Sequence, residues 1–371
     1  MQTATGIKRV RADGKSARVT IAHLAAETGL TKGTVSRALN GYPDIAEGTR
    51  ARVERVAARL GYRPMAQAQA IRTGRAKALG LVMQVSEHDG HSPFLTDFLA
   101  GVTTAAGSQG WTLTVATAPT GEGMRDVLHS LVEDRKADGF ILQRTLRQDP
   151  RIEYLRDMQV PFVLYGRCED LTGISYYDIR GGAAMRAGVR RLIDMGHRDI
   201  AFVTSGCEYN YTHLRTEGFL AAMAEAGLAP TDVVWDVRDH AGGVRATRDL
   251  LAREVPPTAI VYVIDQAALG GYRAIEEAGL TVGADVSVMA YDGIPEGAYA
   301  SPPLTTWKVD TRAAGAALAR MLIERIKGEA EPEALRWLAD ATLHIGGSDG
   351  PPARTSAHLR QKMNNQKGGT T

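Results

Sequence analysis

The chain has 371 residues, 44% of them hydrophobic, which exceeds one typical domain and allows a substantial buried core. Its formal charge of +2 is uneven: residues 1–75 hold 14 Lys or Arg against 5 Asp or Glu, a charge of +9, and the rest hold 30 against 37, a charge of −7. Two cysteines, Cys168 and Cys207, and no apolar run near the roughly 18 residues of a membrane span argue against a disulfide scaffold and a membrane protein.

Residues 1–18 form a basic leader that lacks the apolar run of a signal peptide. We therefore expect a cytoplasmic protein that does not enter a membrane. The leader itself is predicted to be disordered, and it either adds unspecific phosphate contacts or is only an extension at the translation start.

Residues 19–41, VTIAHLAAETGLTKGTVSRALNG, predict two short helices around a sharp turn. The first begins after Thr20, a residue type that caps helices, and ends before Gly29, and the second begins after Thr31. The apolar positions at helical spacing are Ile21, Leu24, Ala25, Val35, Ala38 and Leu39. Such a pair is either an ordinary helical hairpin or a helix-turn-helix unit, whose second helix enters the major groove of DNA.

The next segment, DIAEGTRARVERVAARLGYRP at residues 44–64, predicts a third amphipathic helix. With this sequel, TVSRALNG, TRARVERVAARLGYRP and a short hinge resemble the lactose-repressor (LacI/GalR) family of bacterial transcription regulators, and the resemblance continues through most of residues 19–346. It implies a helix-turn-helix DNA-binding domain at residues 19–64, a hinge at 65–75 and an effector-binding, dimerising core at 76–346.

The outward side chains of the second helix are the candidate DNA contacts. Arg37 is the first candidate for reading a base, because its guanidinium can bond two acceptors on a guanine edge. Lys32 is the second, at a position where the family places a specificity residue, whereas Gly33 departs from the family's pattern. The remaining candidates have short polar side chains that suit phosphates or simply cap and solvate the helices: Thr20, Thr31, Thr34, Ser36 and Asn40.

Residues 64–75, PMAQAQAIRTGR, link the head to the core. The resemblance implies a hinge that becomes a helix when two subunits sit side by side on the operator, with one aliphatic side chain from each wedged into the minor groove. Ile71 stands at that position, and Ala68 is small enough for close approach. So short a helix is marginal alone in water, so its folding is available as a switch. A plain flexible linker is the alternative.

From Ala78 onward, short apolar runs alternate with helical patterns, and the rhythm starts again near Gly173. Strands separated by helices imply parallel sheets that are covered on both faces. The predicted fold class is therefore α/β: a small all-α helix-turn-helix head followed by two lobes, each with a parallel, doubly wound sheet. The expected helices are 94–107, 125–135, 181–195, 212–226, 243–251 and 266–278.

The family resemblance implies that this core has the periplasmic-binding-protein type I fold, in which the chain crosses between the lobes three times. We place the crossings near residues 177, 305 and 333. They give an N-lobe of about 76–176 plus 306–332 and a C-lobe of about 177–304 plus 333–346. A last pair of strands is expected within residues 335–348. Residues 347–371 are predicted to be disordered and to lack the leucine heptads of tetrameric members.

Ligands of open parallel sheets bind at the carboxyl ends of the strands, so two facing lobes create a cleft. The resemblance implies that Arg215 and Asp292 contact the effector, offering donors and acceptors to a polyhydroxy ligand. Alternatively, Arg215 pairs with Glu217, and Asp292 caps the turn that follows it. Phe94 either stacks on the ligand or belongs to the core, and the weaker candidates are Arg167, Asp178 and Asp265.

Three functions of different classes follow from these features. The leading hypothesis is a homodimeric repressor of a carbohydrate operon, which binds double-stranded operator DNA and responds to a small sugar or polyol. The others are a cytoplasmic solute receptor without regulatory DNA binding and an α/β enzyme. Because we find no nucleophile elbow, phosphate loop, metal-spaced cluster or matched acid and base, we predict no catalytic residue, no metal and no cofactor. His197 is not proposed as a catalyst.

Overall fold

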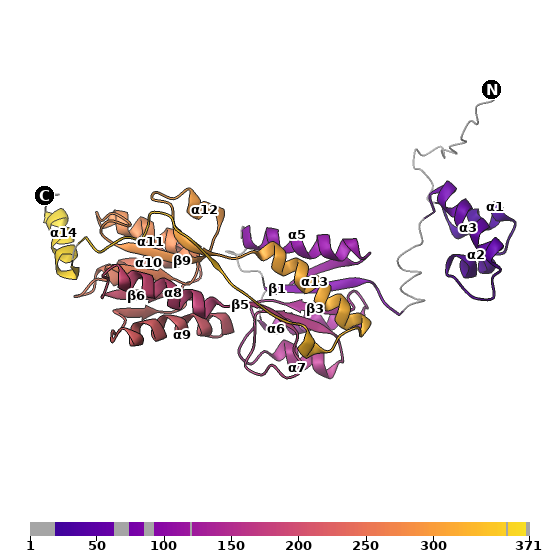
Figure 1. The fold of residues 1–371 in the computed structure, drawn as a ribbon, viewed down its shortest axis with the longest axis horizontal. Helices are drawn as coiled ribbons and strands as arrows, with labels where there is room; N and C mark the ends of the chain where they lie inside the picture. The colour runs from indigo at the N-terminus through magenta and orange to yellow at the C-terminus, as the bar shows by residue number, and fades with distance from the viewer. Residues whose placement is uncertain (1–18, 63–73, 85–92, 119–120, 354, 369–371) are drawn as a thin grey trace, which may run out of the picture. The chain divides into compact units, whose positions relative to one another are not determined.

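The computed structural model describes residues 19–62, 74–84, 93–118, 121–353 and 355–368. The chain divides into two compact units between Ala76 and Lys77. Within the described residues, the first unit contains three helices, and the second contains two six-stranded sheets with their covering helices (Figure 1). Among the described stretches, every helix is too short or too polar to cross a lipid bilayer.

The first unit is built from α1 (Ile21–Thr28), α2 (Lys32–Leu39) and α3 (Glu47–Leu60). Gly29 ends α1 with a φ of 66°, a left-handed conformation that glycine adopts without steric cost. The predicted apolar positions form the core of the first unit, in which Leu24, Val35 and Val53 are fully buried. The three helices thus enclose one small apolar cluster and expose the polar face of α2.

The N-lobe sheet has the strand order β11-β5-β4-β3-β1-β2, and all its neighbouring pairs are parallel. Helices α5 and α13 cover one face, and α6 and α7 cover the other (Figure 1). Leu79 and Leu81 face α5 and α13, whereas Phe140 and Leu142 face α6 and α7, as alternation along a strand requires. The elements are β1 (Ala78–Gln84), α5 (Pro93–Ser108), β2 (Thr112–Ala118), α6 (Gly121–Glu133), β3 (Gly139–Leu142), α7 (Pro150–Asp157), β4 (Phe162–Tyr165), β5 (Tyr176–Ile179), α13 (Thr311–Lys327), η1 (Pro332–Ala334) and β11 (Arg336–Ala339).

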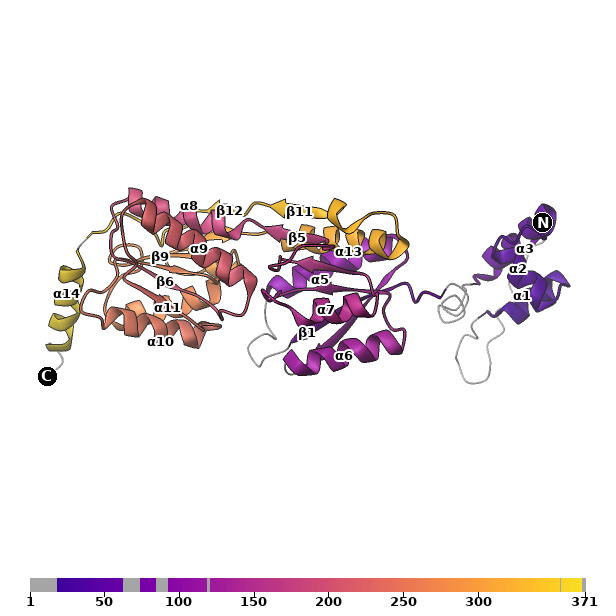
Figure 2. The same cartoon turned by 90° about the horizontal axis from the view of Figure 1, so that it is seen from below.

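The C-lobe sheet has the order β12-β10-β9-β8-β6-β7, and only the β10–β12 pair is antiparallel. Helices α8 and α9 cover one face and α10 and α11 the other (Figure 2). The elements are α8 (Gly181–Asp194), β6 (Ile200–Val203), α9 (Asn210–Glu225), β7 (Asp232–Val234), α10 (His240–Leu251), β8 (Ala259–Tyr262), α11 (Asp265–Glu277), β9 (Ser287–Asp292), α12 (Pro295–Ala298), β10 (Thr305–Lys308) and β12 (Thr342–His344).

The chain passes between the lobes a few residues later than the sequence predicted. β5 pairs in the N-lobe sheet up to Ile179, so the first crossing follows residue 179 and not 177. β10 pairs with β9 in the C-lobe sheet, and β11 pairs with β5 in the N-lobe sheet, so the other crossings lie after 308 and after 339. β5, β10 and β11 each complete their pairing before the chain leaves the lobe, so the crossings lie two, three and six residues after the predicted positions.

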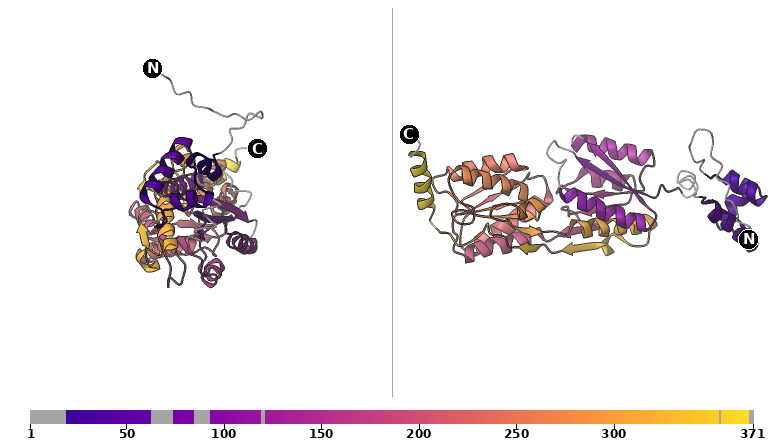
Figure 3. Two further views of the ribbon diagram at one scale, coloured as in Figure 1. Left: turned by 90° about the vertical axis from the view of Figure 1, so that its right-hand side faces the viewer. Right: turned by 90° about the horizontal axis from the view of Figure 1, so that it is seen from above.

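The prediction that residues 347–371 are disordered is wrong for the part that the structure describes. The Ser348 hydroxyl donates to the Val288 carbonyl at 2.7 Å, and the Gly350 carbonyl lies 2.8 Å from Nε2 of the buried His197. Residues 356–368 form α14 (Ser356–Gly368), which lies at the end of the C-lobe away from the N-lobe (Figure 3). Leu359 is fully buried against the C-lobe core, and this contact fixes the helix.

Candidate functional site

A cavity of about 460 Å³ lies at the carboxyl ends of the strands of both sheets. The N-lobe contributes residues that end or follow β1, β3, β4 and β5, and the C-lobe contributes residues that end or follow β6, β7, β8 and β9. Parallel strands bring their carboxyl ends to one edge, so the fold gathers side chains that are far apart in sequence. The strand-end residues are Gln84, Gln143, Tyr165, Asp178, Ser205, Asp236, Ile264 and Asp292.

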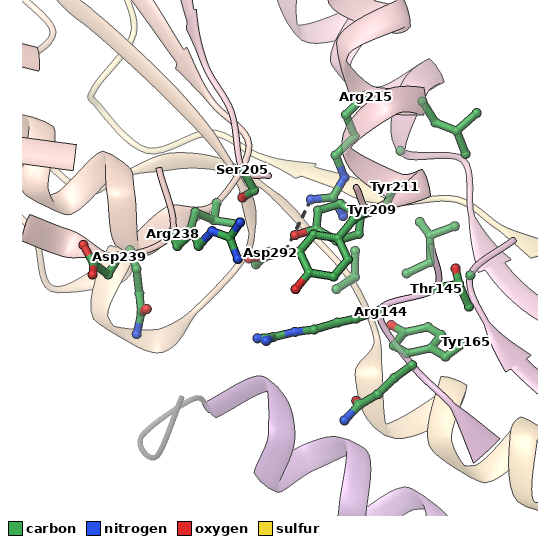
Figure 4. Close-up of a pocket in the computed structure, with 18 of the residues that line it drawn as sticks. Arg144, Thr145, Tyr165, Ser205, Tyr209, Tyr211, Arg215, Arg238, Asp239 and Asp292 are labelled. Carbon is green, nitrogen blue, oxygen red and sulfur yellow. Dashed lines mark ion pairs between the residues drawn. The ribbon is translucent and has the colours of Figure 1, made fainter. Parts of the chain in front are cut away.

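Arg215, on α9, is fixed in this cavity by its neighbours (Figure 4). Its guanidinium carbon lies 3.7 Å from the ring centroid of Tyr291 and 4.9 Å from that of Tyr211. Nη1 donates to the Val263 carbonyl at 2.9 Å and lies 3.9 Å from Oδ1 of Asp292. Glu217, the alternative partner, lies instead 3.0 Å from His213. Arg215 is therefore held by cation–π contacts and a backbone acceptor, with its charge directed at the cavity.

Asp292 ends β9 and also lines the cavity. Its φ of 122° is unusual for a residue with a side chain and is followed by Gly293 at 74°. Burial raises the pKa of Asp292 to about 7, although the nearby Arg215 charge opposes this rise. Asp292 does not cap the next turn, since the Gly293 and Ile294 amides donate to Asp265 at 2.7 and 2.8 Å.

Asp265 lies outside the cavity lining, contrary to the prediction that it contacts the ligand. It is fully buried at the start of α11, and its Oδ1 accepts a hydrogen bond from the Thr306 hydroxyl at 2.6 Å. Its other oxygen accepts both amides of the turn after Asp292. With three donors on one carboxylate, Asp265 is a structural residue that holds the backbone next to Asp292.

Asp178 lines the cavity, and Arg167 lies outside the lining but pairs with it, with Nε 2.5 Å from Oδ2. Phe94 lies in the first turn of α5, and its side chain is outside the part that the structure describes. Of the six predicted ligand contacts, the fold therefore brings Asp178, Arg215 and Asp292 together at the cavity.

Sequence reasoning missed the aromatic side chains and the other arginines of the cavity. Tyr209 and Tyr211 stack with ring centroids 5.6 Å apart, and Arg144 and Arg238 reach the cavity from different lobes (Figure 4). The signal for Arg144 was its place directly after β3, and the tyrosines stand four and six residues before Arg215.

The loop at residues 143–149 closes one side of the cavity and contacts both lobes. The Asn210 amide donates to the Thr145 carbonyl at 3.0 Å, and Leu146 forms an antiparallel bridge with Tyr209. The Asn210 side chain also donates to the Arg167 carbonyl at 2.8 Å. These contacts join the N-lobe to the start of α9, directly beside the residues that line the cavity.

Replacing Asp292 with Asn should flatten the pH dependence of core stability. The folded-state pKa of Asp292, about 7, lies above its ordinary value of 3.8, so folding favours the protonated form. The stability that protonation of Asp292 adds to the folded core is fully present below about pH 4 and is lost as the pH rises through about 7. The melting temperature of the wild type should thus fall more across this window than that of Asp292→Asn. Asp340→Asn, at an exposed carboxylate, is the control, and parallel curves for wild type and Asp292→Asn would refute the assignment.

In the first unit, several predicted DNA contacts also form local hydrogen bonds. The Thr31 hydroxyl accepts from the Thr34 amide at 3.1 Å and caps α2, and the Asn40 side chain donates to the Ser36 carbonyl at 2.6 Å. The Thr20 amide, before α1, donates to His23 Nδ1 at 3.0 Å. These side chains shape the helices whether or not they also meet phosphates.

Arg37 and Lys32 are exposed on α2. The Arg37 guanidinium lies 2.7 Å from Asp44 and 4.7 Å from the Tyr42 ring centroid, and both side chains of the ion pair are about half exposed. Such a pair holds Arg37 loosely and leaves it accessible. Ala68 and Ile71, the predicted hinge contacts, lie outside the described residues.

Within the described ranges, no group of three or more His, Cys, Asp or Glu side chains is placed to hold a metal ion. The polar groups that line the core cavity are guanidinium, carboxylate, amide, hydroxyl and tyrosine groups. The first unit offers a different chemistry, a polar and basic helical face.

Comparisons with known proteins find matches for both the first unit and the core. The family model described as bacterial regulatory proteins, lacI family, matches residues 20–65, and the periplasmic binding protein-like domain matches residues 189–348. The HTH-type transcriptional regulator AglR of Rhizobium meliloti (strain 1021) is 34% identical over 345 residues, covering 90% of this chain and 95% of the relative.

Two solved structures match over most of this chain. The transcriptional regulator CelR–cellobiose complex is 30% identical, with a TM-score of 0.68 over 89% of this chain and 100% of that one. The lac repressor dimer bound to operator and the anti-inducer ONPF is 26% identical, with a TM-score of 0.77 over 90% and 100%. The chain thus belongs to the LacI family of bacterial regulatory proteins, and it is a DNA-binding transcriptional regulator and not an enzyme.

Proposed function

We propose that this regulator represses genes of carbohydrate uptake or catabolism and that a sugar or polyol in the interlobe cavity changes its affinity for operator DNA. It acts as a homodimer in the cytoplasm, with two heads on one operator. The lac repressor dimer on its operator and the CelR–cellobiose complex support the two halves of this proposal. Family membership argues against a receptor without DNA binding.

The observation that carries the proposed ligand class is the chemistry of the cavity lining. Four arginines and four aspartates line it, so the positive and negative charges of the lining nearly balance and favour a neutral ligand. Guanidinium groups only donate hydrogen bonds and carboxylates only accept them, whereas each sugar hydroxyl does both. Tyr165, Tyr209 and Tyr211 add flat, partly apolar surfaces of the kind that small-molecule sites use. A neutral polyhydroxy ligand matches this mixture.

We also propose that ligand binding in the core cavity is coupled to DNA binding by the head. A ligand held by both lobes changes their mutual arrangement, and the N-lobe begins directly after the hinge segment. Ile71 in that segment is proposed as the minor-groove wedge and Ala68 as a close-approach position. Loss of ligand contacts should therefore leave DNA binding intact while removing its regulation.

Replacing Arg37 with Ala tests the DNA-reading half. A duplex is first selected from a random pool by the wild-type protein. On this duplex the variant should lose about 1–3 kcal/mol of binding free energy, and on random DNA far less, because a guanine-edge contact exists only at the correct sequence. Fluorescence anisotropy at one fixed salt concentration measures both affinities.

Arg59→Ala is the matched control, since Arg59 is another exposed arginine of the head and pairs with Glu27. It removes the same charge and should weaken both duplexes equally. If Arg37→Ala behaves in the same way, Arg37 contacts phosphate and does not read a base. If the wild type selects no duplex at all, the proposed function itself fails.

A further inference from the structure

The cavity carries two separate sets of charged side chains. The inner cluster, Asp178, Arg215 and Asp292, is largely shielded, with side-chain exposures of 12%, 13% and 24%. The rim cluster consists of Asp236, Arg238, Asp239 and Arg245, which follow β7 and enter α10. In it, Asp236 and Arg238 are 67% and 53% exposed. The cavity lining therefore carries both shielded and exposed charged side chains.

The rim cluster is held in place by its own contacts. Nη2 of Arg238 lies 2.8 Å from Glu208 and 3.4 Å from Asp236. Gly206 leaves the space for it, because a Cβ at that position would lie 2.6 Å from Nη2. Asp239 accepts the Gly242 amide at 2.6 Å as the N-cap of α10, which fixes its carboxylate. These side chains are oriented before any ligand arrives.

Donors and acceptors occur together in the inner cluster and in the rim cluster. A guanidinium has five N–H donors, and both ion pairs of Arg238 use Nη2, which leaves Nη1 and Nε suited to a ligand hydroxyl. Figure 4 shows Arg238 and Arg215 approaching the cavity from different sides, with Tyr209 and Tyr211 near Arg215. A single sugar ring would use the donors and acceptors of only one of the two clusters.

We propose that the effector has at least two sugar rings, with one ring at the inner cluster and the next at the rim cluster, where Arg238 determines specificity for the longer ligand. This inference rests on the proposed function and narrows its ligand class from sugars and polyols to oligosaccharides. The rim cluster supplies the exposed donors and acceptors that a second ring requires, and a relative, the transcriptional regulator CelR, was solved in complex with cellobiose, a two-ring sugar.

Isothermal titration calorimetry on the full chain tests this proposal with glucose, galactose, maltose, cellobiose and raffinose. At least one of the longer sugars should bind about tenfold or more tightly than its constituent monosaccharides. Arg238→Ala should lower the affinity for the longer sugar by about tenfold, with a much smaller effect on the monosaccharides, and Arg238→Lys should restore part of the loss. Arg253→Ala, at an exposed arginine that pairs with Asp232 and lies outside the cavity lining, is the matched control and should change neither.

Three calorimetric results would overturn the inference: monosaccharides that bind as tightly as the longer sugars, equal losses for both ligand lengths in Arg238→Ala, or binding of none of the five sugars. A monosaccharide that controls DNA binding would refute the two-ring site and keep the proposed function. Tight disaccharide binding without any change in DNA affinity would keep the two-ring site and refute the proposed function.

Discussion

Replacing Arg151 with Met should lower the unfolding free energy of the core by about 3–5 kcal/mol. This is the largest loss of stability that we expect from a single substitution. The Asp149 carboxylate is completely buried, and Arg151 donates to it through Nε at 2.8 Å and Nη2 at 2.6 Å. Nη2 also reaches the carbonyls of Gln143 and Arg144 at 3.1 and 3.3 Å. Methionine fills a similar volume but leaves a buried charge without its cation.

The same change should also weaken ligand binding, because Gln143 and Arg144 line the cavity. Denaturant unfolding of the core measures the stability, and calorimetry with the best sugar measures the affinity. Arg147→Met is the control: Arg147 lies 3.0 Å from Glu169, both side chains are nearly half exposed, and the expected cost is at most about 1 kcal/mol. Equal losses of unfolding free energy in Arg147→Met and Arg151→Met would show that the buried Asp149–Arg151 pair does not organise the loop at residues 143–149.

Replacing Arg215 with Met should abolish the response to ligand while the head still binds DNA. The substitution keeps an unbranched side chain beside Tyr211 and Tyr291 but removes the charge and the donors that face the cavity. A hydrogen bond from a charged group contributes about 1.5–3 kcal/mol, so the loss of one such bond lowers ligand affinity by about tenfold to about a hundredfold. Titration calorimetry measures this loss directly.

Arg190→Met provides the comparison for Arg215, since Arg190 is an exposed arginine of the same lobe that pairs with Glu225. It should keep both ligand affinity and DNA regulation. An unchanged ligand response in Arg215→Met would remove Arg215 from the site. A simultaneous loss of DNA binding would indicate a general folding defect, which circular dichroism of the variant would reveal.

Local patterns in the sequence were sufficient for the head and for most of the core. The apolar spacing of Leu24, Val35 and Val53 depends only on neighbours within each helix, and all three are buried as predicted. The alternation of strands and helices likewise indicates parallel sheets, which places strand-end residues such as Asp178 and Asp292 at one edge.

What the sequence could not indicate depends on contacts between distant segments. Asp265 follows a strand as a ligand residue would, but its carboxylate binds amides 28 and 29 residues away, and no local pattern distinguishes these roles. The last segment lacks periodicity, yet Ser348 and Leu359 are fully buried because they dock on strands and helices formed much earlier in the chain. The rim cluster was missed because β7 is short and its flanking loop carries no distinct motif.

The central claim is that a ligand in the core cavity controls DNA binding by the head. The most direct measurement is the affinity of the full chain for its selected duplex, by fluorescence anisotropy, without sugar and with a sugar that calorimetry shows to saturate the cavity. We predict that this affinity changes by about tenfold or more in the wild type, within the usual range of allosteric coupling, and not at all in Arg215→Met. Equal affinity of the wild type with and without bound sugar would contradict this claim.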